Sequence, residues 1–306
     1  RWVTFNGTRD SDYFGSIEWA NADQLGVDRL IRPINKRDLF VVDARSGKAT
    51  AIRHEEDRAW IQDIFARNTK FTWRNTGASF VWETEIDGWR RAYDVTADGS
   101  RLTPVTPPNV DVIETRHVDE PGGWLYYIAS PDNATQRYLY RARLDGSGAA
   151  DRVTPPEQPG THTYNIAPGG RFAVHGYSTA DTPPVIELIE LPSHRVVRVL
   201  EDNARLREKL AAQKPAPFEF TKVDLGDGVV LDAWLLKPRD FDPSKKYPVL
   251  VFVYGEPAAQ TVIDSWDIGH RHFHRAIADA GYVILSIDNR GTPAPKGTAW
   301  RRVIFP

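Results

Sequence analysis

The sequence predicts a partial β-propeller followed by the first part of a domain that alternates strands and helices. Turn-forming residues at Gly47, Gly99, Gly146 and Ser193 recur 52, 47 and 47 residues apart. Short runs of β-branched and aromatic residues lie between these turns over the first 200 residues. A helical segment and two longer apolar runs come after them. The period and the change of pattern together indicate two different architectures in one chain.

The first 200 residues contain a strand before each of the four turns. These strands are Asp38–Ala44, Arg90–Thr96, Arg137–Arg143 and Val185–Leu191, and another short strand follows each turn. A period near 47 residues with several strands per unit is typical of β-propeller blades, which are roughly 40–50 residues long. We therefore expect about four blades. An irregular β-sandwich is the alternative, because it also has short, evenly spaced strands.

A helix is expected over residues 203–213, with Asp202 or Asn203 capping its start and Pro215 ending it. The following segment, Phe218–Pro238, reads as two strands joined by a turn at Gly226–Gly228. Residues 201–306 therefore form a second region of the chain.

Two continuous apolar runs follow this hairpin. Pro248–Tyr254 and Tyr282–Asp288 are expected to be strands buried on both faces of a parallel sheet. An amphipathic helix is expected between them over His270–Ala280. A strand, a helix and a strand within about 40 residues form a βαβ unit.

The composition excludes several classes of protein. The 306 residues are 41% hydrophobic and 26% charged, and the net charge of −2 gives no electrostatic basis for binding nucleic acid or an anionic membrane. There is no apolar run of 18 residues, so we expect no membrane span in this chain. There is no cysteine, which excludes disulfides and thiol catalysis. The chain begins at Arg1 without a methionine, and we expect a cut or processed start.

Four segments carry a resemblance to a known family. They are Thr84–Tyr93 (TEIDGWRRAY), Arg198–Asn203 (RVLEDN), Phe241–Pro257 (FDPSKKYPVLVFVYGEP) and Asp288–Gly291 (DNRG). In this order and spacing they resemble the prolyl oligopeptidase superfamily of serine peptidases, family S9, and most closely its dipeptidyl peptidase IV branch. The resemblance implies a partial β-propeller over residues 1–200. It also implies a linker helix and the N-terminal part of an α/β-hydrolase domain over residues 201–306.

The resemblance implies a serine exopeptidase that cleaves dipeptides from peptide N-termini through an acyl-enzyme. The released dipeptide is expected to be Xaa-Pro. It implies peptide substrates, no cofactor and no metal. The Gly-x-Ser-x-Gly motif that carries the nucleophile is absent from this sequence. The family order puts Ser, Asp and His of the triad beyond Pro306, so we expect this chain alone to be inactive.

Two alternatives stay open at this point. One is an oligopeptidase or acylaminoacyl peptidase of the same superfamily, and the other is a non-catalytic propeller that binds peptides. The resemblance also leaves open a homodimer for the full-length protein and a periplasmic or secreted location.

Tyr254 is the residue of this chain that we expect to take part in catalysis. It ends the apolar run Pro248–Tyr254, and the loop after this strand supplies part of the oxyanion hole in α/β-hydrolases. The resemblance implies that the Tyr254 hydroxyl donates a hydrogen bond to the developing oxyanion. Glu256 follows closely, and its carboxylate would oppose a nearby oxyanion unless it pointed away or paired with a cation.

Other candidate residues are better explained by structure. Ser178, in Gly176–Ala180, lacks the final glycine of the nucleophile motif and precedes the apolar strands, so we expect a polar residue of a blade. Glu55 and Glu56 form an adjacent pair like the one that binds the substrate amino group in the resembled branch. Their sequence context differs, and we expect a polar link between blades.

Three histidines, His270, His272 and His274, lie at the start of the second predicted helix, with His270 and His274 one turn apart. This spacing could hold a metal, but the glutamate of the metalloprotease motif is absent, and we expect solvated or capping side chains. We expect the segment Asp288–Arg290 to shape the loop after the second apolar strand.

Overall fold

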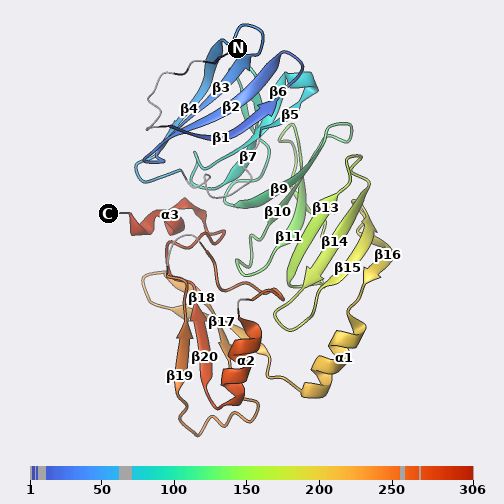
Figure 1. Cartoon of the computed structure of the whole chain (residues 1–306), viewed down its shortest axis with the longest axis vertical. Helices are drawn as coiled ribbons and strands as arrows, with labels where there is room; N and C mark the ends of the chain where they lie inside the picture. The colour runs from blue at the N-terminus through green and yellow to red at the C-terminus, as the bar shows by residue number, and fades with distance from the viewer. Residues whose placement is uncertain are drawn as a thin grey trace. The chain divides into compact units, whose positions relative to one another are not determined.

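The computed structural model describes residues 2–3, 5, 12–61, 71–255, 259–268 and 270–305. Within these ranges the strands form five four-stranded sheets (Figure 1). Four of the sheets come before helix α1 and are built from strands in sequence order, and the fifth comes after it. No helix in the described ranges has the length and apolar character needed to cross a membrane.

The first sheet contains β1 (Asp12–Trp19), β2 (Gln24–Ile31), β3 (Lys36–Asp43) and β4 (Ala49–Glu56). The second contains β5 (Thr72–Arg74), β6 (Ser79–Thr84), β7 (Arg91–Thr96) and β8 (Leu102–Pro104), with the short helix η2 (Asn75–Gly77) after β5. The third contains β9 (Val112–Asp119), β10 (Trp124–Ala129), β11 (Tyr138–Arg143) and β12 (Asp151–Arg152). The fourth contains β13 (Thr161–Ile166), β14 (Phe172–Ser178), β15 (Val185–Glu190) and β16 (Arg195–Glu201).

After these come α1 (Ala204–Gln213), β17 (Phe218–Asp224), β18 (Val230–Leu236), β19 (Val249–Phe252), α2 (Arg271–Asp279), β20 (Val283–Ile287), α3 (Gly297–Arg301) and η3 (Arg302–Ile304).

The predicted repeat is confirmed at the level of strands and turns. The four strands that precede the predicted turns are β3, β7, β11 and β15, and each is the third strand of its sheet. Gly47, Gly99 and Gly146 have φ angles of 79°, 72° and 74° in the turns that follow, a conformation that only glycine adopts readily. Ser193 lies in the turn between β15 and β16. Repeated four-stranded units in sequence order are typical of β-propeller blades.

The chain divides into two compact units, which are described separately. Unit 1 consists of Arg1–Ile128, Tyr140–Asp151 and Gly297–Pro306, and unit 2 of Ala129–Leu139 and Arg152–Lys296. In unit 1 the strand β6 is buried along its whole length, so neighbouring elements cover both of its faces. The core around it contains the side chains of Leu39, Phe71, Phe80, Trp82, Tyr93 and Val95.

A network of buried ions binds α3 within unit 1. Arg301, which is only 2% exposed, donates from Nη2 to Glu85 Oε1 at 2.6 Å and from Nη1 to Asp111 Oδ2 at 2.7 Å. The backbone N–H of Gly297 donates to the same Asp111 oxygen at 2.7 Å, and Arg302 Nη2 donates to Glu85 Oε2 at 2.8 Å. Burial opposes the charge of Arg301, but Asp111 and Glu85 raise its pKa above the ordinary value.

Unit 2 contains the fifth sheet, whose strand order is β17-β18-β20-β19. β17 and β18 form the predicted antiparallel hairpin, with Gly226 and Gly228 at φ angles of 84° and 74° in its turn. β19 and β20 are parallel, and α2 lies between them in the sequence. The predicted strand–helix–strand arrangement is therefore confirmed.

The prediction that Pro248–Tyr254 is buried on both faces is wrong for this chain. The strand order puts β19 at the edge of the sheet, where Val249 and Val251 are 56% and 55% exposed. Leu250 and Phe252 alternate with them and pack against the core that contains Trp234. The strand therefore has one covered face and one open face.

Helix α1 starts and ends where the sequence predicts. Asn203 is its N-cap residue but makes no side-chain capping hydrogen bond. Asp202 Oδ1 instead accepts a hydrogen bond from the backbone N–H of Ala204 at 2.8 Å. The helix ends at Gln213, before Pro215, and none of its residues is buried.

Three histidines are packed together inside the fourth sheet of unit 2. His162 Nδ1 and His175 Nε2 are 2.8 Å apart, and the Tyr164 hydroxyl lies 2.9 Å from His194 Nε2. His175 Nδ1 faces Glu187 Oε2 at 3.3 Å. All three rings are buried, so the cluster has little access to water.

Burial lowers the pKa of all three histidines. It lowers the pKa of His162 to about 4, although a hydrogen bond to the Gln158 carbonyl acts in the opposite direction. It lowers the pKa of His175 to about 2, with the neighbouring His162 and His194 acting in the same direction. The pKa of His194 is also lowered by burial. The three rings are therefore neutral at neutral pH.

Replacing Arg301 by methionine should destabilise unit 1 by about 3 to 5 kcal/mol, because the buried Asp111 would lose its ion pair and Glu85 would keep only its contacts with Arg302 and Arg90. The matched control is Arg195→Met, which removes an exposed ion pair with Glu190 and should change stability by about 1 kcal/mol or less. Urea-induced unfolding followed by tryptophan fluorescence measures both. Equal unfolding midpoints for the two variants would contradict the role given to Arg301.

The free energy of unfolding should fall as the pH falls below about 6.5, the ordinary pKa of histidine. Below this pH the histidines of the unfolded chain bind protons, while the buried histidines of the folded chain stay neutral. Each histidine contributes a slope of up to about 1.4 kcal/mol per pH unit, until the pH reaches its folded-state pKa. For His162 that limit is about 4.

The variant His162→Gln isolates this effect from that of the carboxylates. Its stability should depend less steeply on pH than that of the unchanged chain, measured by urea unfolding across this window. The exposed His272→Gln serves as the control. Parallel pH profiles for the unchanged chain and His162→Gln would rule out the buried cluster as a source of acid sensitivity.

Candidate functional site

Tyr254 follows the end of β19, two residues after Phe252. The residue is 49% exposed. Gly255 comes next with a φ angle of 81°, a backbone conformation that glycine adopts without strain. Glu256, whose carboxylate the sequence analysis considered, lies outside the described residues.

Asp288 fixes the far end of the loop that begins at Tyr254. Its Oδ1 accepts hydrogen bonds from the backbone N–H and the hydroxyl of Thr261, both at 2.8 Å, and its Oδ2 accepts the N–H of Val262 at 3.1 Å. Burial raises the pKa of Asp288, while these donors act in the opposite direction. Asp288 therefore anchors the segment at Thr261 and Val262.

Tyr254 and Asp288 lie at the same edge of the sheet. β19 and β20 are parallel; Tyr254 lies two residues after the carboxyl end of β19, and Asp288 directly follows that of β20. Ligands of open α/β sheets bind at this edge. The edge is therefore the candidate site, with a phenol donor whose loop is held at its far end by a buried carboxylate.

The remaining serine and glutamate candidates have structural contacts. Ser178 ends β14, and its hydroxyl oxygen accepts the backbone N–H of Trp266 at 3.2 Å. The prediction that Glu55 and Glu56 form a link between blades is wrong, because both lie in β4. Alternation along the strand puts them on opposite faces: Glu55 accepts the Thr84 hydroxyl at 2.8 Å, and Glu56 forms an exposed ion pair.

The three histidines near α2 have different environments. His270 is the N-cap residue and His272 is exposed. His274 is buried, and its ring centroid lies 5.4 Å from that of Trp234 and 4.9 Å from that of Phe252. Burial lowers the pKa of His274, with the His270 charge acting in the same direction. His274 is therefore a packed core residue.

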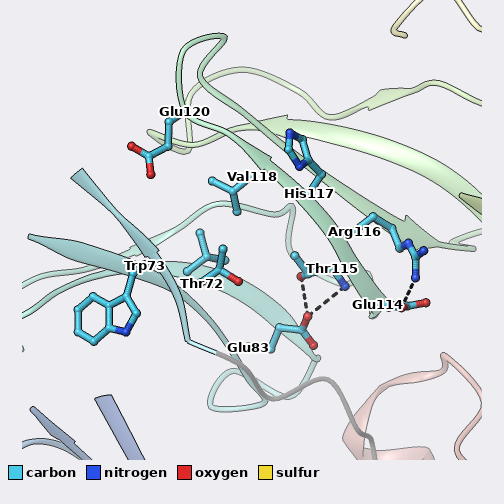
Figure 2. Close-up of a pocket in the computed structure, with 10 residues that line it drawn as sticks. Thr72, Trp73, Glu83, Glu114, Thr115, Arg116, His117, Val118 and Glu120 are labelled. Atoms are coloured by element: carbon cyan, nitrogen blue, oxygen red, sulfur yellow. Dashed lines mark hydrogen bonds and ion pairs between the residues drawn. The ribbon is translucent and has the colours of Figure 1, made fainter. Parts of the chain in front are cut away.

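A cavity of about 410 Å³ lies between β5 and β9, the first strands of the second and third sheets (Figure 2). Glu83 in its wall accepts hydrogen bonds from Thr115, at 3.2 Å from the backbone N–H and 2.6 Å from the hydroxyl. Glu114 forms an ion pair with Arg116, as the dashed line in Figure 2 shows. The indole N–H of Trp73 donates to the Glu18 carbonyl at 3.2 Å, which anchors the ring.

Three glutamates, Glu83, Glu114 and Glu120, line this cavity together with one arginine, Arg116. Burial lowers the pKa of the His117 ring, while the charge of Asp119 acts in the opposite direction.

The sequence analysis missed this cavity. One signal was present: in β9, Glu114 and Arg116 alternate with Thr115 and His117, so both faces of the strand carry polar residues. A strand that packs between two sheets normally carries apolar residues there.

Comparisons with known proteins identify the family and fold to which this chain is similar. A family model described as the dipeptidyl peptidase IV (DPP IV) N-terminal region matches residues 1–184. A protein of Emericella nidulans named "Probable dipeptidyl-aminopeptidase B" is 29% identical over 288 residues, which is 90% of this chain and 31% of that protein. A protein of the same name from Uncinocarpus reesii is 26% identical over 289 residues, again 90% of this chain and 31% of that protein.

The crystal structure of Porphyromonas gingivalis dipeptidyl peptidase 4 superimposes with a TM-score of 0.88 and 29% identity, covering 98% of this chain and 41% of that one. A second structure, from Bacteroides ovatus, has a TM-score of 0.83 at 22% identity and supports the fold alone. The chain thus spans about a third of the curated relatives that it matches. The match of the family model over more than half of the chain identifies it as a member of the dipeptidyl peptidase IV family.

Proposed function

We propose that this chain is part of a serine peptidase that releases dipeptides, with Xaa-Pro as the preferred product, from peptide N-termini. The structural likeness to a dipeptidyl peptidase 4 over 98% of the chain is the observation that carries the proposal. In this proposal residues 1–200 are about four blades of a propeller, and residues 201–306 are a linker helix and the first part of an α/β-hydrolase domain. The nucleophilic serine and its aspartate and histidine partners lie beyond Pro306.

Tyr254 supplies part of the oxyanion hole in this proposal. Attack of the serine oxygen on the peptide carbonyl breaks the carbonyl π bond and puts a negative charge on its oxygen. A phenol donor aimed at that oxygen stabilises the transition state more than the ground state. The exposure of Tyr254 at the carboxyl edge of β19 supports this role, because the hydroxyl is free to meet a substrate.

Asp288 acts as a positioning residue in the same proposal. The loop after Tyr254 would lose precision if its far end could move, and a misplacement of about 1 Å can cost a large factor in rate. Its three hydrogen bonds to Thr261 and Val262 hold that end in place. In this proposal Asp288 takes no part in the bond-making or proton-transfer steps of the reaction.

A second candidate function is peptide binding by the propeller without catalysis. The acidic cavity lined by Glu83, Glu114 and Glu120 supports it, because a peptide carries a positively charged amino terminus. The complete gene decides between the two functions. A full-length sequence without Gly-x-Ser-x-Gly would favour peptide binding alone.

The 306-residue chain alone should show no peptidase activity, because its sequence lacks the motif that carries the nucleophile. The test is incubation with a chromogenic Xaa-Pro substrate and, separately, with a fluorophosphonate probe that labels activated serines. The full-length protein is the positive control. Turnover or labelling of the short chain above the buffer blank would refute the assignment of the nucleophile to a later segment.

In the full-length enzyme, Tyr254→Phe should lower kcat by roughly 10- to 1000-fold and leave KM within a few-fold, because the lost hydrogen bond forms only in the transition state. Steady-state kinetics with the same Xaa-Pro substrate measures both constants. Tyr247→Phe is a matched control, since its hydroxyl accepts the backbone N–H of Asp242 at 2.8 Å, away from the strand end. An unchanged kcat for Tyr254→Phe would contradict the oxyanion role and leave packing as the function of Tyr254.

A further inference from the structure

A second cavity, in unit 2, has no part in the proposed peptidase chemistry. Its volume is about 200 Å³, and its walls come from α1, from α2 and from the segment around Arg239 (Figure 1 shows the two helices). Three arginines line it: Arg239, Arg271 and Arg275. All of its lining residues lie within unit 2.

Arg271 is the unusual member of this group. Its side chain belongs to a residue that is only 6% exposed, and its guanidinium carbon lies 3.4 Å from the centroid of the Trp266 ring. One nitrogen, Nη2, donates to the Ala180 carbonyl. The other two, Nε and Nη1, have no hydrogen-bond partner among the described residues. Arg271 thus has a stacking partner but an incomplete set of acceptors.

Two nearby carboxylates pair with the other two arginines, and Asp267 acts on Arg271 only through its charge, without an ion pair. Arg275 Nη2 pairs with Asp181 Oδ1 at 2.6 Å, and Arg239 Nη2 pairs with Asp279 Oδ2 at 2.6 Å. Arg271 forms no ion pair within the described ranges. The lining of the cavity therefore contains three arginines and one carboxylate, Asp279.

The charge of Arg271 is maintained at neutral pH. Burial lowers the pKa of Arg271 to about 10, and the neighbouring charge of Arg275 acts in the same direction, while the charges of Asp181 and Asp267 oppose this effect. Burial also raises the pKa of Asp181, although Arg275 opposes this effect. A guanidinium with this pKa keeps its proton at neutral pH. The two Arg271 nitrogens that lack an acceptor among the described residues cost free energy that an anion bound in the cavity would recover.

We propose that this cavity is a binding site for a small oxyanion, a carboxylate or a phosphate, which Arg271 holds. The planar fork of an arginine presents parallel N–H groups that match two oxygens of either anion. A water molecule occupies about 30 Å³, so a cavity of about 200 Å³ has room for such an ion with a few waters. Arg271 and His272 lie in the first turn of α2, where the helix dipole also favours an anion.

The test uses the purified chain at about neutral pH. It is titrated with inorganic phosphate and, separately, with acetate, and sodium chloride at matched ionic strength is the reference. Calorimetry and the melting temperature report binding. The proposal expects saturable binding of at least one of the two oxyanions, with a rise in melting temperature that chloride does not produce.

Saturation by phosphate alone would identify a tetrahedral oxyanion as the ligand, and saturation by acetate alone would identify a carboxylate. Saturation by both would support their shared chemistry. Saturation by neither would overturn the proposal.

Variants locate the site. Arg271→Gln should weaken binding by about tenfold or more, the effect of losing hydrogen bonds to a charged group. Arg239→Gln changes an exposed residue of the same cavity and should weaken binding by a smaller factor. If Arg271→Gln does not fold, Arg239→Gln tests the location of the site in its place. Arg195→Gln removes the same charge from β16, outside the cavity, and should leave binding unchanged. Equal affinities for Arg239→Gln, Arg271→Gln and the unchanged chain would overturn the assignment to this cavity.

Discussion

A four-stranded sheet with two apolar faces is not stable alone in water, and most of this chain is arranged to meet that constraint. The strand β6 is buried at all six of its positions, whereas β16 is exposed at all seven. A strand of similar composition is therefore core or surface according to whether another element covers it. The near-47-residue repeat follows from this need, because each unit must present the same surface to the next.

Two buried arginines differ in their charged partners: one has a structural role, and the other lines a candidate binding site. Arg301 and Arg271 are 2% and 6% exposed, so both are removed from water. Arg301 faces two carboxylates, Glu85 and Asp111, and its pKa is raised. Arg271 forms no ion pair within the described ranges, two of its nitrogens have no hydrogen-bond partner there, and burial lowers its pKa. The first arrangement holds α3 in place, and the second leaves hydrogen-bond donors at the wall of a cavity.

The sequence predicts local structure well and surroundings poorly. Turns at Gly47, Gly99 and Gly146, the hairpin at Gly226–Gly228 and the parallel pair around α2 depend on nearby residues, and the structure agrees with them. The burial of Pro248–Tyr254 and the location of Glu55 were predicted wrongly. Hydrophobicity shows that a strand can be buried, but not that a neighbour covers it. The two cavities depend on contacts between residues that are distant in sequence, which no local pattern reveals.

In the proposed function, acyl transfer takes place at the carboxyl edge of β19 and β20. Tyr254 donates a hydrogen bond to the oxyanion there, and Asp288 holds the far end of the loop after Tyr254. The most direct test is a crystal structure of the full-length protein with a peptide boronic acid bound covalently to its nucleophile. The account predicts a boron-bound oxygen within about 3 Å of the Tyr254 hydroxyl. A boronate adduct with Tyr254 turned away from that oxygen, or an adduct at a site remote from this edge, would contradict it.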